Sequence, residues 1–373
     1  PTGPPRDAVL TGPPANTVPE SVYAKLGAGL HTRPDHPICM IKQAVYDFFD
    51  GGDFGAFTKL DDLPAIVPAT ANFDDVLVPA DHVSRSPNDT YYVDDETVLR
   101  CHTSAHQAAT LQKGERAFLV TGDVYRRDSV DASHYPVFHQ MEGVRVYEEG
   151  EWKAAGAASG AAHAEANLKA ALEGLAARLF GAGAETRWVD AYFPFTEPSF
   201  ELEVLFRGEW LEVLGCGVVQ PAILDRAGVA RGAAAWAFGL GLERLAMVLF
   251  GIPDIRLFWT DDARFTKQFR AGDLTTRFSP YSKFPPCFKD VSFWQADGGE
   301  LTENDVCEVV RSLAGDLAEA VTLVDAFTHP KTGRISHCYR VAYRSMDRSL
   351  EDGEINELQE GVRAALSERV ELR

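Results

Sequence analysis

Apolar side chains recur every three or four residues in three parts of the chain. In HPICMIKQAVYDFF they stand at Ile38, Ile41 and Val45, which is the period of an amphipathic helix. The same spacing returns at 168–179 and in GLERLAMVLF at 241–250. The sequence therefore predicts three helices that each turn one apolar face towards a core.

Short apolar segments separated by turns predict strands in the first two thirds of the chain. With the helices, they indicate an α+β fold built on an antiparallel sheet. Alanine and glycine crowd residues 154–164, AAGAASGAAHA, and predict a flexible insertion there. The predicted strands are VLVPA (76–80), TYYV (90–93), AFLVTGDVY (117–125), VFHQMEGVRVY (137–147), FELEVLF (200–206) and GEWLEVLGCGVV (208–219).

The C-terminal part of the chain has a pattern of its own. Thr302 and Asp305 resemble a capping box, which predicts the start of a helix that ends near Leu313. Strands are predicted at 289–294, 320–327 and 334–345, a second helix from about Ser349, and a short strand at 370–372. This order is typical of a ferredoxin-like unit. The predicted division is a flexible N-terminal tail at 1–30, a main domain at 31–275 and the ferredoxin-like domain at 281–373.

Composition narrows the class of protein. The chain has 373 residues, 45% of them hydrophobic, which is enough for a large core. It contains no run of 18 apolar residues, and its Pro/Gly-rich start has no apolar segment, so neither a membrane span nor a secretory signal is expected. The six cysteines form no CxxC pair, which argues for reduced thiols and against structural zinc. The net charge of -19 argues against broad attraction to nucleic acid.

Three arginines stand out from this acidic background. Arg126 and Arg127 follow an alternating segment, so they point to opposite faces and only one can face a pocket. Arg244 lies in an otherwise apolar helix beside glycine-rich backbone, where a ligand can approach closely. The alternatives are a surface ion pair for the first two and a buried Arg–Glu pair for the third. Neither a dinucleotide fingerprint nor a phosphate loop of the GxxxxGK[ST] type is present.

Several motifs resemble those of a known family. GDVYRRD followed by HYPVFHQMEG resembles motif 2 of class II aminoacyl-tRNA synthetases, and AFGLGLERLAM resembles their motif 3. LRCHTSAHQ, YFPFTEPSFE and EWLEVLGCG are similar to segments of phenylalanyl-tRNA synthetases. The resemblance covers about residues 31 to 373 and fits the single-chain, mitochondrial type best. It implies a class II antiparallel β-sheet flanked by helices, followed by a ferredoxin-like anticodon-binding domain.

The resemblance also implies an activity. A member of this family uses ATP and Mg²⁺ to activate L-phenylalanine as an adenylate and transfers it to tRNA(Phe) for organellar translation. The expected protein is a monomer without membrane contact in the mitochondrial matrix, with the plastid as the alternative. A ligase of the same fold that acts on another carboxylate is one rival interpretation. A synthetase-like RNA-binding or regulatory protein without catalysis is the other.

Family roles carry over to matching positions. Arg126 would clamp the ATP α-phosphate, Arg244 would lie near the γ-phosphate and adenine, and Glu212 would hold Mg²⁺ or order the nucleotide. The remaining predicted substrate-binding residues come from the same motifs. The motif 2 loop contributes Ser133, His134 and Tyr135 around ATP; the amino-acid pocket has His102, Ser104, Ala105, His106, Gln107, Gln140, Met141 and Glu142; Phe193 and Phe195 would face the substrate ring; Ala237 and Phe238 would line the floor and the adenine side.

The predicted tRNA surface is a basic cluster in the C-terminal domain. It lies within an acidic unit, with 11 Lys+Arg against 17 Asp+Glu from residue 280 on. A basic strand face can track phosphates, and Arg340 and Arg344 would share such a face. A solvated sheet face without a partner is the alternative. The predicted tRNA-binding residues are Lys331, Arg334, Arg340, Arg344 and Arg348.

Overall fold

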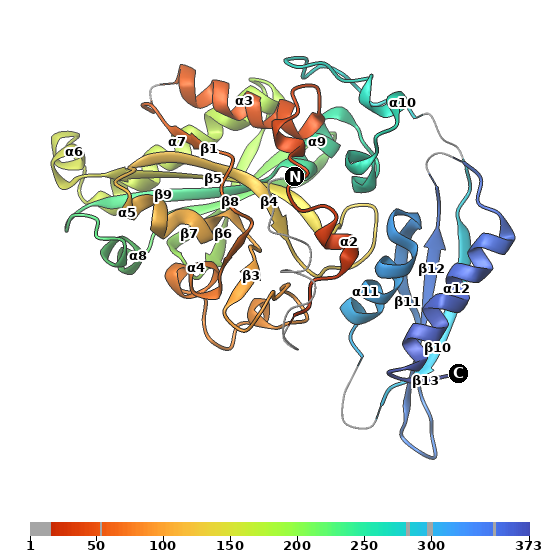
Figure 1. Ribbon diagram of the computed structural model, residues 1–373. Helices are drawn as coiled ribbons and strands as arrows, with labels where there is room; N and C mark the ends of the chain where they lie inside the picture. Colours follow the sequence, from red (N-terminus) through yellow and green to blue (C-terminus); the bar gives the residue numbers. More distant parts are fainter. Residues whose placement is uncertain (1–15, 53, 281–283, 297–300, 346–347) are drawn as a thin grey trace.

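A seven-stranded sheet forms the main body of the protein (Figure 1). The computed structural model describes residues 16–52, 54–280, 284–296, 301–345 and 348–373. All neighbouring strands of this sheet run antiparallel except β1 and β4, which confirms the predicted fold class. In sheet order, the strands are β1 (Thr58–Leu60), β4 (Ala117–Tyr125), β5 (Val137–Tyr147), β9 (Ala234–Gly241), β8 (Glu209–Val219), β7 (Thr196–Phe206) and β6 (Thr186–Phe193).

Three helices cover one face of this sheet, which we call the back face. They are α3 (Pro37–Gly51), α7 (Gly160–Phe180) and α9 (Leu242–Phe250), and their apolar sides enter the largest core cluster as the sequence predicts. The expectation of a flexible insertion is wrong for residues 160–164, which form the first turn of α7. Ser159 caps that turn by accepting a hydrogen bond from Ala162 N–H.

The other elements of the main body are short and lie around both faces of the sheet. The predicted strands at 76–80 and 90–93 are wrong, because these apolar residues pack as irregular backbone: Val76 and Val78 join a small cluster around Phe73, and Tyr92 forms only an isolated bridge. None of the helices in the described ranges is long and apolar enough to span a membrane. The short elements are α2 (Glu20–Tyr23), α4 (Ala69–Asn72), α5 (Gln107–Gln112), α6 (Glu149–Ala154), α8 (Pro221–Arg226), α10 (Ala263–Thr266), β2 (Ile66–Pro68), β3 (Thr97–Leu99) and the 3₁₀ turns η1 (Leu30–Thr32), η2 (Asp74–Val76), η3 (Val83–Arg85), η4 (Thr103–His106), η5 (Ile255–Trp259) and η6 (Gly315–Leu317).

Residues 16–30, which the sequence assigns to a flexible tail, lie against the main body. Val22 and Leu30 are buried in the large core cluster, so apolar contact fixes this segment. Lys25 extends over the rings of Tyr135 and Trp259 at 5.3 and 4.9 Å. The part of the predicted tail at 1–15 falls outside the described residues.

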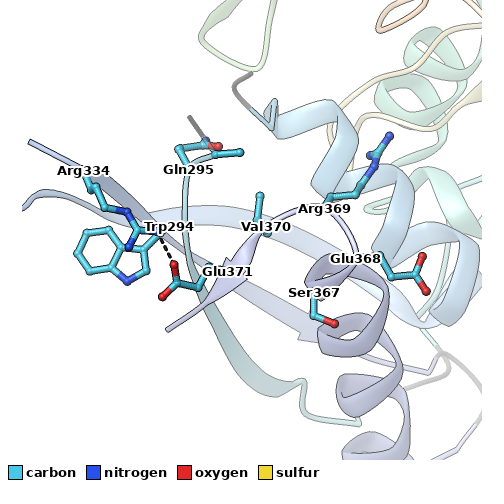
Figure 2. Close-up of a pocket in the computed structure, with 9 residues that line it drawn as sticks. Trp294, Gln295, Arg334, Ser367, Glu368, Arg369, Val370 and Glu371 are labelled. Carbon is cyan, nitrogen blue, oxygen red and sulfur yellow. Dashed lines mark hydrogen bonds and ion pairs between the residues drawn. The ribbon is translucent and has the colours of Figure 1, made fainter. Parts of the chain in front are cut away.

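The C-terminal residues form a separate sheet in the order β11-β12-β10-β13 with two helices on one side, which is the predicted ferredoxin-like arrangement. At one end of this sheet, a cavity of about 400 Å³ is lined by side chains that include Trp294, Arg334 and Glu371 (Figure 2). The elements of this domain are β10 (Cys287–Trp294), α11 (Glu303–Ala314), β11 (Ala318–Thr328), β12 (Ile335–Tyr343), α12 (Asp352–Ser367) and β13 (Glu371–Leu372).

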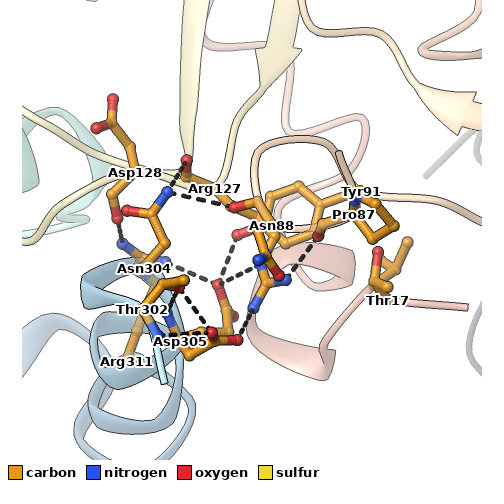
Figure 3. A network of polar contacts seen from close by, with 12 residues as sticks. Thr17, Pro87, Asn88, Tyr91, Arg127, Asp128, Thr302, Asn304, Asp305 and Arg311 are labelled. Carbon is orange, nitrogen blue, oxygen red and sulfur yellow. Dashed lines mark hydrogen bonds and ion pairs between the residues drawn. The ribbon is translucent and has the colours of Figure 1, made fainter. Parts of the chain in front are cut away.

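The two domains meet through a network of partly buried polar contacts (Figure 3). The Arg127 guanidinium lies 3.5 Å from Asp305 and 3.9 Å from Glu308 of α11, and Tyr91 donates its hydroxyl hydrogen bond to Glu308. Val130 enters the core of the C-terminal domain, and its carbonyl accepts a hydrogen bond from the Val321 N–H. The loop between β4 and β5 is therefore held by both domains.

Candidate active site

The centre of the sheet carries very small residues on the face opposite the three helices, which we call the front face. Ala237 of β9 stands opposite Gly217 of β8 and Val144 of β5. A Cβ at Gly215 would come within 2.7 Å of the Phe193 ring, and one at Gly217 within 2.4 Å of a carbonyl oxygen. These glycines are needed because neighbouring groups approach the strand this closely. The result is a shallow apolar floor beside aromatic rings.

A polar cluster lies next to this floor. Ser104 donates a hydrogen bond to Glu142, and the Thr103 N–H donates to Oε1 of Gln140 at 3.2 Å. Among the described residues, four buried polar atoms of this cluster have no hydrogen-bond partner: Glu142 Oε1, Gln107 Oε1, Thr103 Oγ1 and His102 Nδ1. Leaving such atoms unpaired is costly. Their convergence indicates the binding site of a small polar group.

The charge of Glu142 fits a cationic partner. Burial raises the pKa of this carboxyl to about 7, although the hydrogen bond from Ser104 and the charge of His102 act in the opposite direction. A buried carboxyl with one free oxygen is stabilised in its ionised form by an ammonium group. The predicted contacts of Ser104, Gln107, Gln140 and Glu142 with an amino acid are thus brought together on one side of the pocket.

The aromatic wall is formed by Phe193 and Phe195. Their rings are stacked with centroids 5.8 Å apart, and Phe195 lies 6.5 Å from the His102 ring. Both side chains are half-buried. Phe195 also packs against the apolar cluster that contains Ala237, so these residues form an apolar surface beside the polar cluster, which we call the aromatic slot. Such a surface suits an aromatic amino acid.

The two predicted catalytic arginines flank the strands next to this slot. Nε of Arg126 donates to the Cys101 carbonyl at 2.8 Å, and its guanidinium lies 5.1 Å from the Phe138 ring. Arg244 is exposed at the start of α9 and lies 3.4 Å from Glu212. Phe138 was missed by the sequence interpretation. Its position two residues before Gln140 on the same strand face is the signal that could have identified it.

Carboxylates near Arg244 could accept a cation. Burial raises the pKa of Glu201, and the charges of Glu212 and Glu203 act in the same direction. No cluster of three or more His, Cys, Asp or Glu side chains with metal-binding spacing occurs in the described part of the chain. One or two carboxylates completed by substrate phosphates are, however, the usual way to bind Mg²⁺. Glu212 and Glu201 fit that pattern.

Several predicted site residues lie elsewhere. Met141 and Phe238 point to the back face, because they alternate with Glu142 and Ala237; Phe238 stacks on Phe49 at 5.7 Å. The Tyr135 hydroxyl donates to Asp316 of the C-terminal domain, so this ring belongs to the domain contact.

Other predicted residues of the same motifs contact neighbouring side chains. His106 lies 2.9 Å from Arg100, whose guanidinium is buried against Asp123. Ala105 is buried in the small apolar cluster around Phe73. Ser133 and His134 are exposed, and both bind the Asp131 carboxylate. The Arg100–Asp123 pair has no local sequence signal, because 22 residues separate its members.

The predicted tRNA-binding arginines do not form one open track, because each already has a carboxylate partner. Arg344 lies 3.0 Å from Glu319, which also lies 3.7 Å from Arg256 of the main domain. Lys331 is exposed in the β11–β12 turn. The remaining ion pairs are Arg334–Glu371, Arg340–Asp290 and Arg348–Glu354.

A cluster of arginines and aromatic rings beside the cavity of Figure 2 was missed by the sequence interpretation. We call Trp294, Phe327, Arg334 and Arg373 the tip cluster. The guanidinium groups of Arg334 and Arg373 lie 5.0 and 5.3 Å from the Trp294 ring, and Arg373 lies 5.1 Å from Phe327. Strand ends from β10, β11, β12 and β13 bring these residues together, so no single segment reveals them.

Comparison with known proteins agrees with this geometry. Residues 25–269 match the family "tRNA synthetases class II core domain (F)", and residues 282–373 match "Ferredoxin-fold anticodon binding domain". The chain is 59% identical to the phenylalanine--tRNA ligase, chloroplastic/mitochondrial, of Arabidopsis thaliana, over 98% of this chain and 85% of that protein. Identity is 48% to the mitochondrial enzyme of Mus musculus, over 93% and 83%, and 44% to that of Dictyostelium discoideum, over 97% and 89%. The chain therefore belongs to the class II aminoacyl-tRNA synthetases, within the family of single-chain organellar phenylalanine--tRNA ligases.

Proposed function

We propose that this chain activates L-phenylalanine with ATP and transfers it to tRNA(Phe) for translation in mitochondria or plastids. The observation that carries the proposal is the buried Glu142 carboxyl with an unpaired oxygen at the end of an aromatic slot. Phenylalanine-dependent exchange of pyrophosphate into ATP is the test. It separates this activity from a ligase of the same fold that uses another carboxylate and from a protein without catalysis.

The first step needs positioning and charge neutralisation. An oxygen of the phenylalanine carboxylate attacks the α-phosphorus of ATP, the bond to the β-phosphate oxygen breaks, and pyrophosphate leaves. The carboxylate is already ionised at neutral pH, so no general base is required. Arg126 neutralises the charge that builds up on the α-phosphate, and Arg244 binds the outer phosphates. Mg²⁺, held by Glu212 and Glu201, would supply charge neutralisation at the phosphates.

The amino acid is oriented by its two polar groups. Its ammonium group binds Glu142 and Ser104, and Gln107 and Gln140 contact the neighbouring polar atoms. Its ring enters the slot between Phe193 and Ala237. In the second step, a ribose hydroxyl at the 3′ end of tRNA attacks the acyl carbon of the adenylate, and AMP leaves. We expect the protein to act as a monomer.

The Ala237 methyl group sets the depth of the slot. We expect Ala237→Gly to raise the catalytic efficiency for para-chlorophenylalanine relative to phenylalanine by about 10-fold, because one methyl group in an apolar pocket is worth about 1–3 kcal/mol. The measurement is the ratio of the two efficiencies in pyrophosphate exchange. Ala235→Gly is the matched control, since Ala235 lies two residues away on the same face of β9 and is also buried. An equal change in both variants would show that Ala237 does not line the slot.

The tip cluster is our candidate for contact with an unpaired base of tRNA. Unpaired bases stack on aromatic rings and guanidinium planes, at about 1–3 kcal/mol per base. Trp294→Ala should therefore lower the efficiency of tRNA charging by about 10- to 100-fold and leave pyrophosphate exchange unchanged. The control is Trp210→Ala in the main domain, which removes a similar ring under Arg187 at 4.2 Å. Equal charging by the Trp294 variant and the wild type would exclude this cluster from tRNA contact.

A further inference from the structure

A buried polar contact between Glu243 and His139 joins α9 to β5 on the back face of the sheet. Oε2 of Glu243 accepts a hydrogen bond from the main-chain N–H of His139 at 2.7 Å, and Oε1 lies 2.7 Å from Nδ1 of the same residue. Glu243 is 2% exposed and His139 0%. A carboxylate buried this deeply is tolerated only when its hydrogen bonds are complete. Both carboxylate oxygens of Glu243 contact the same residue, His139.

The contact completes the sheet at the point where β9 ends. β5 and β9 pair as far as Gln140 and Gly241, and the chain then turns into α9. The next main-chain N–H of β5 that points towards β9 belongs to His139. Because β9 has already ended, no strand carbonyl lies opposite this N–H. The Glu243 carboxylate takes the place of the missing strand carbonyl. Its position in the first turn of α9 is also favoured by the helix dipole.

The residues next to this pair carry the nucleotide contacts. Arg244 follows Glu243 directly in α9. Phe138 precedes His139 in β5, points to the front face, and supports the Arg126 guanidinium at 5.1 Å. A single buried contact thus ties the segment that carries Arg244 to the strand that supports Arg126.

We infer that Glu243 and His139 are positioning residues that fix the spacing of Arg126 and Arg244 on the two sides of ATP. The inference rests on the proposed function, which gives both arginines their ligand. Neither member of the pair touches substrate, so its effect passes through the arginines. Displacement of a catalytic group by about 1 Å can lower a rate by about 10²-fold, and a helix start freed from its strand allows such a shift.

Two substitutions of His139 separate the effect of losing the hydrogen-bond donor to Glu243 from the effect of changing the size of the side chain. The amide nitrogen of asparagine stands where Nδ1 of histidine stands, so His139→Asn keeps the donor to Glu243. Glutamine places its amide nitrogen where Nε2 stands, so His139→Gln loses that donor. We expect His139→Gln and Glu243→Gln to lower kcat/KM for ATP in pyrophosphate exchange by about 10- to 100-fold, with KM for phenylalanine changed less than about threefold. His139→Asn should stay within about fivefold of the wild type.

Tyr46→Phe is the control for stability. It removes a buried hydrogen bond to Thr121 on the back face of the neighbouring strand; it should lower Tm without changing KM for ATP. Glu243→Gln added to Arg244→Ala should cost nothing beyond Arg244→Ala alone, because both act through one guanidinium. Equal defects in the asparagine and glutamine variants, or additive effects in the double variant, would overturn the inference.

The proposed function and this inference can fail separately. If the wild type shows no phenylalanine-dependent exchange, the proposed function fails. ATP affinity measured by calorimetry on the same variants then still decides the positioning role: loss in His139→Gln with retention in His139→Asn supports it, and equal affinities overturn it.

Discussion

Replacing Arg126 by alanine is expected to slow adenylate formation by about 10² to 10³, the usual effect of losing one preorganised donor at a developing charge. The guanidinium is fixed before substrate binds, by its hydrogen bond to the Cys101 carbonyl and by the Phe138 ring. Lysine should restore little, because it lacks the planar pair of donors. The measurement is the single-turnover rate of adenylate formation at saturating ATP and phenylalanine.

Arg116→Ala is the matched control for this substitution. Arg116 immediately precedes β4, at the other end of the strand from Arg126, and pairs with Glu148 at 3.6 Å on the surface. The substitution also removes one positive charge beside β4, but the rate of adenylate formation should remain unchanged. A rate for Arg126→Ala within about threefold of the wild type would show that another group stabilises the α-phosphate.

Replacing Glu142 by glutamine is expected to weaken phenylalanine binding by roughly 10²- to 10³-fold at pH 8, as the loss of a buried charge partner usually does. The pKa of Glu142 lies at about 7 in the free protein because the side chain is buried. Roughly nine carboxyls in ten are therefore protonated at pH 6, and the ammonium group of phenylalanine must displace that proton. Wild-type affinity should fall about tenfold per pH unit below 7, and this dependence should vanish in Glu142→Gln.

Calorimetry in buffers with different heats of ionisation measures how many protons are released when phenylalanine binds. About one proton should be released per phenylalanine bound well below pH 7 by the wild type, and none by Glu142→Gln. His102 is the other group that could release a proton, because burial lowers its pKa but Cys101 and Glu142 raise it by more. Proton release that persists in Glu142→Gln would assign the titration to another group.

The same substitution should stabilise the unliganded protein. The pKa of Glu142 is raised on folding from 4.5 to about 7, so its contribution to stability is fully present below pH 4.5 and is lost as the pH rises through 7. At pH 8 the ionised carboxylate costs up to about 3 kcal/mol. Glu142→Gln should therefore raise Tm at pH 8 and have little effect at pH 4.5. A lower Tm at pH 8 would contradict burial as the cause of the raised pKa.

The sequence predicts the sheet and the pocket best where strand alternation and motifs coincide. Gln140, Glu142 and Ala237 stand on the front face as expected. Met141 and Phe238 belong to the same motifs, but strand alternation places them on the back face, in the large core. The apolar runs at 76–80 and 90–93 could not be distinguished from strands, because burial in a small satellite core produces the same pattern.

Other features depend on contacts between distant segments. The Arg100–Asp123 pair requires Gly122, where a Cβ would lie 2.0 Å from the guanidinium. The tip cluster requires the ends of four strands to meet. The Arg127 contacts require the position of a second domain. In each case the information lies in the packing of elements, which periodicity along the chain does not encode.

Because both domains contact the β4–β5 loop, its position depends on the order in which the two domains are synthesised. Val130 leaves the ribosome long before its partner Val321, and at about 5–20 residues per second the delay between them is roughly 10 to 40 s. During that interval the main domain can bury its own core, but the C-terminal domain against which Val130 packs does not yet exist. The newly made chain can therefore place the β4–β5 loop only after β11, which carries Val321, has been synthesised.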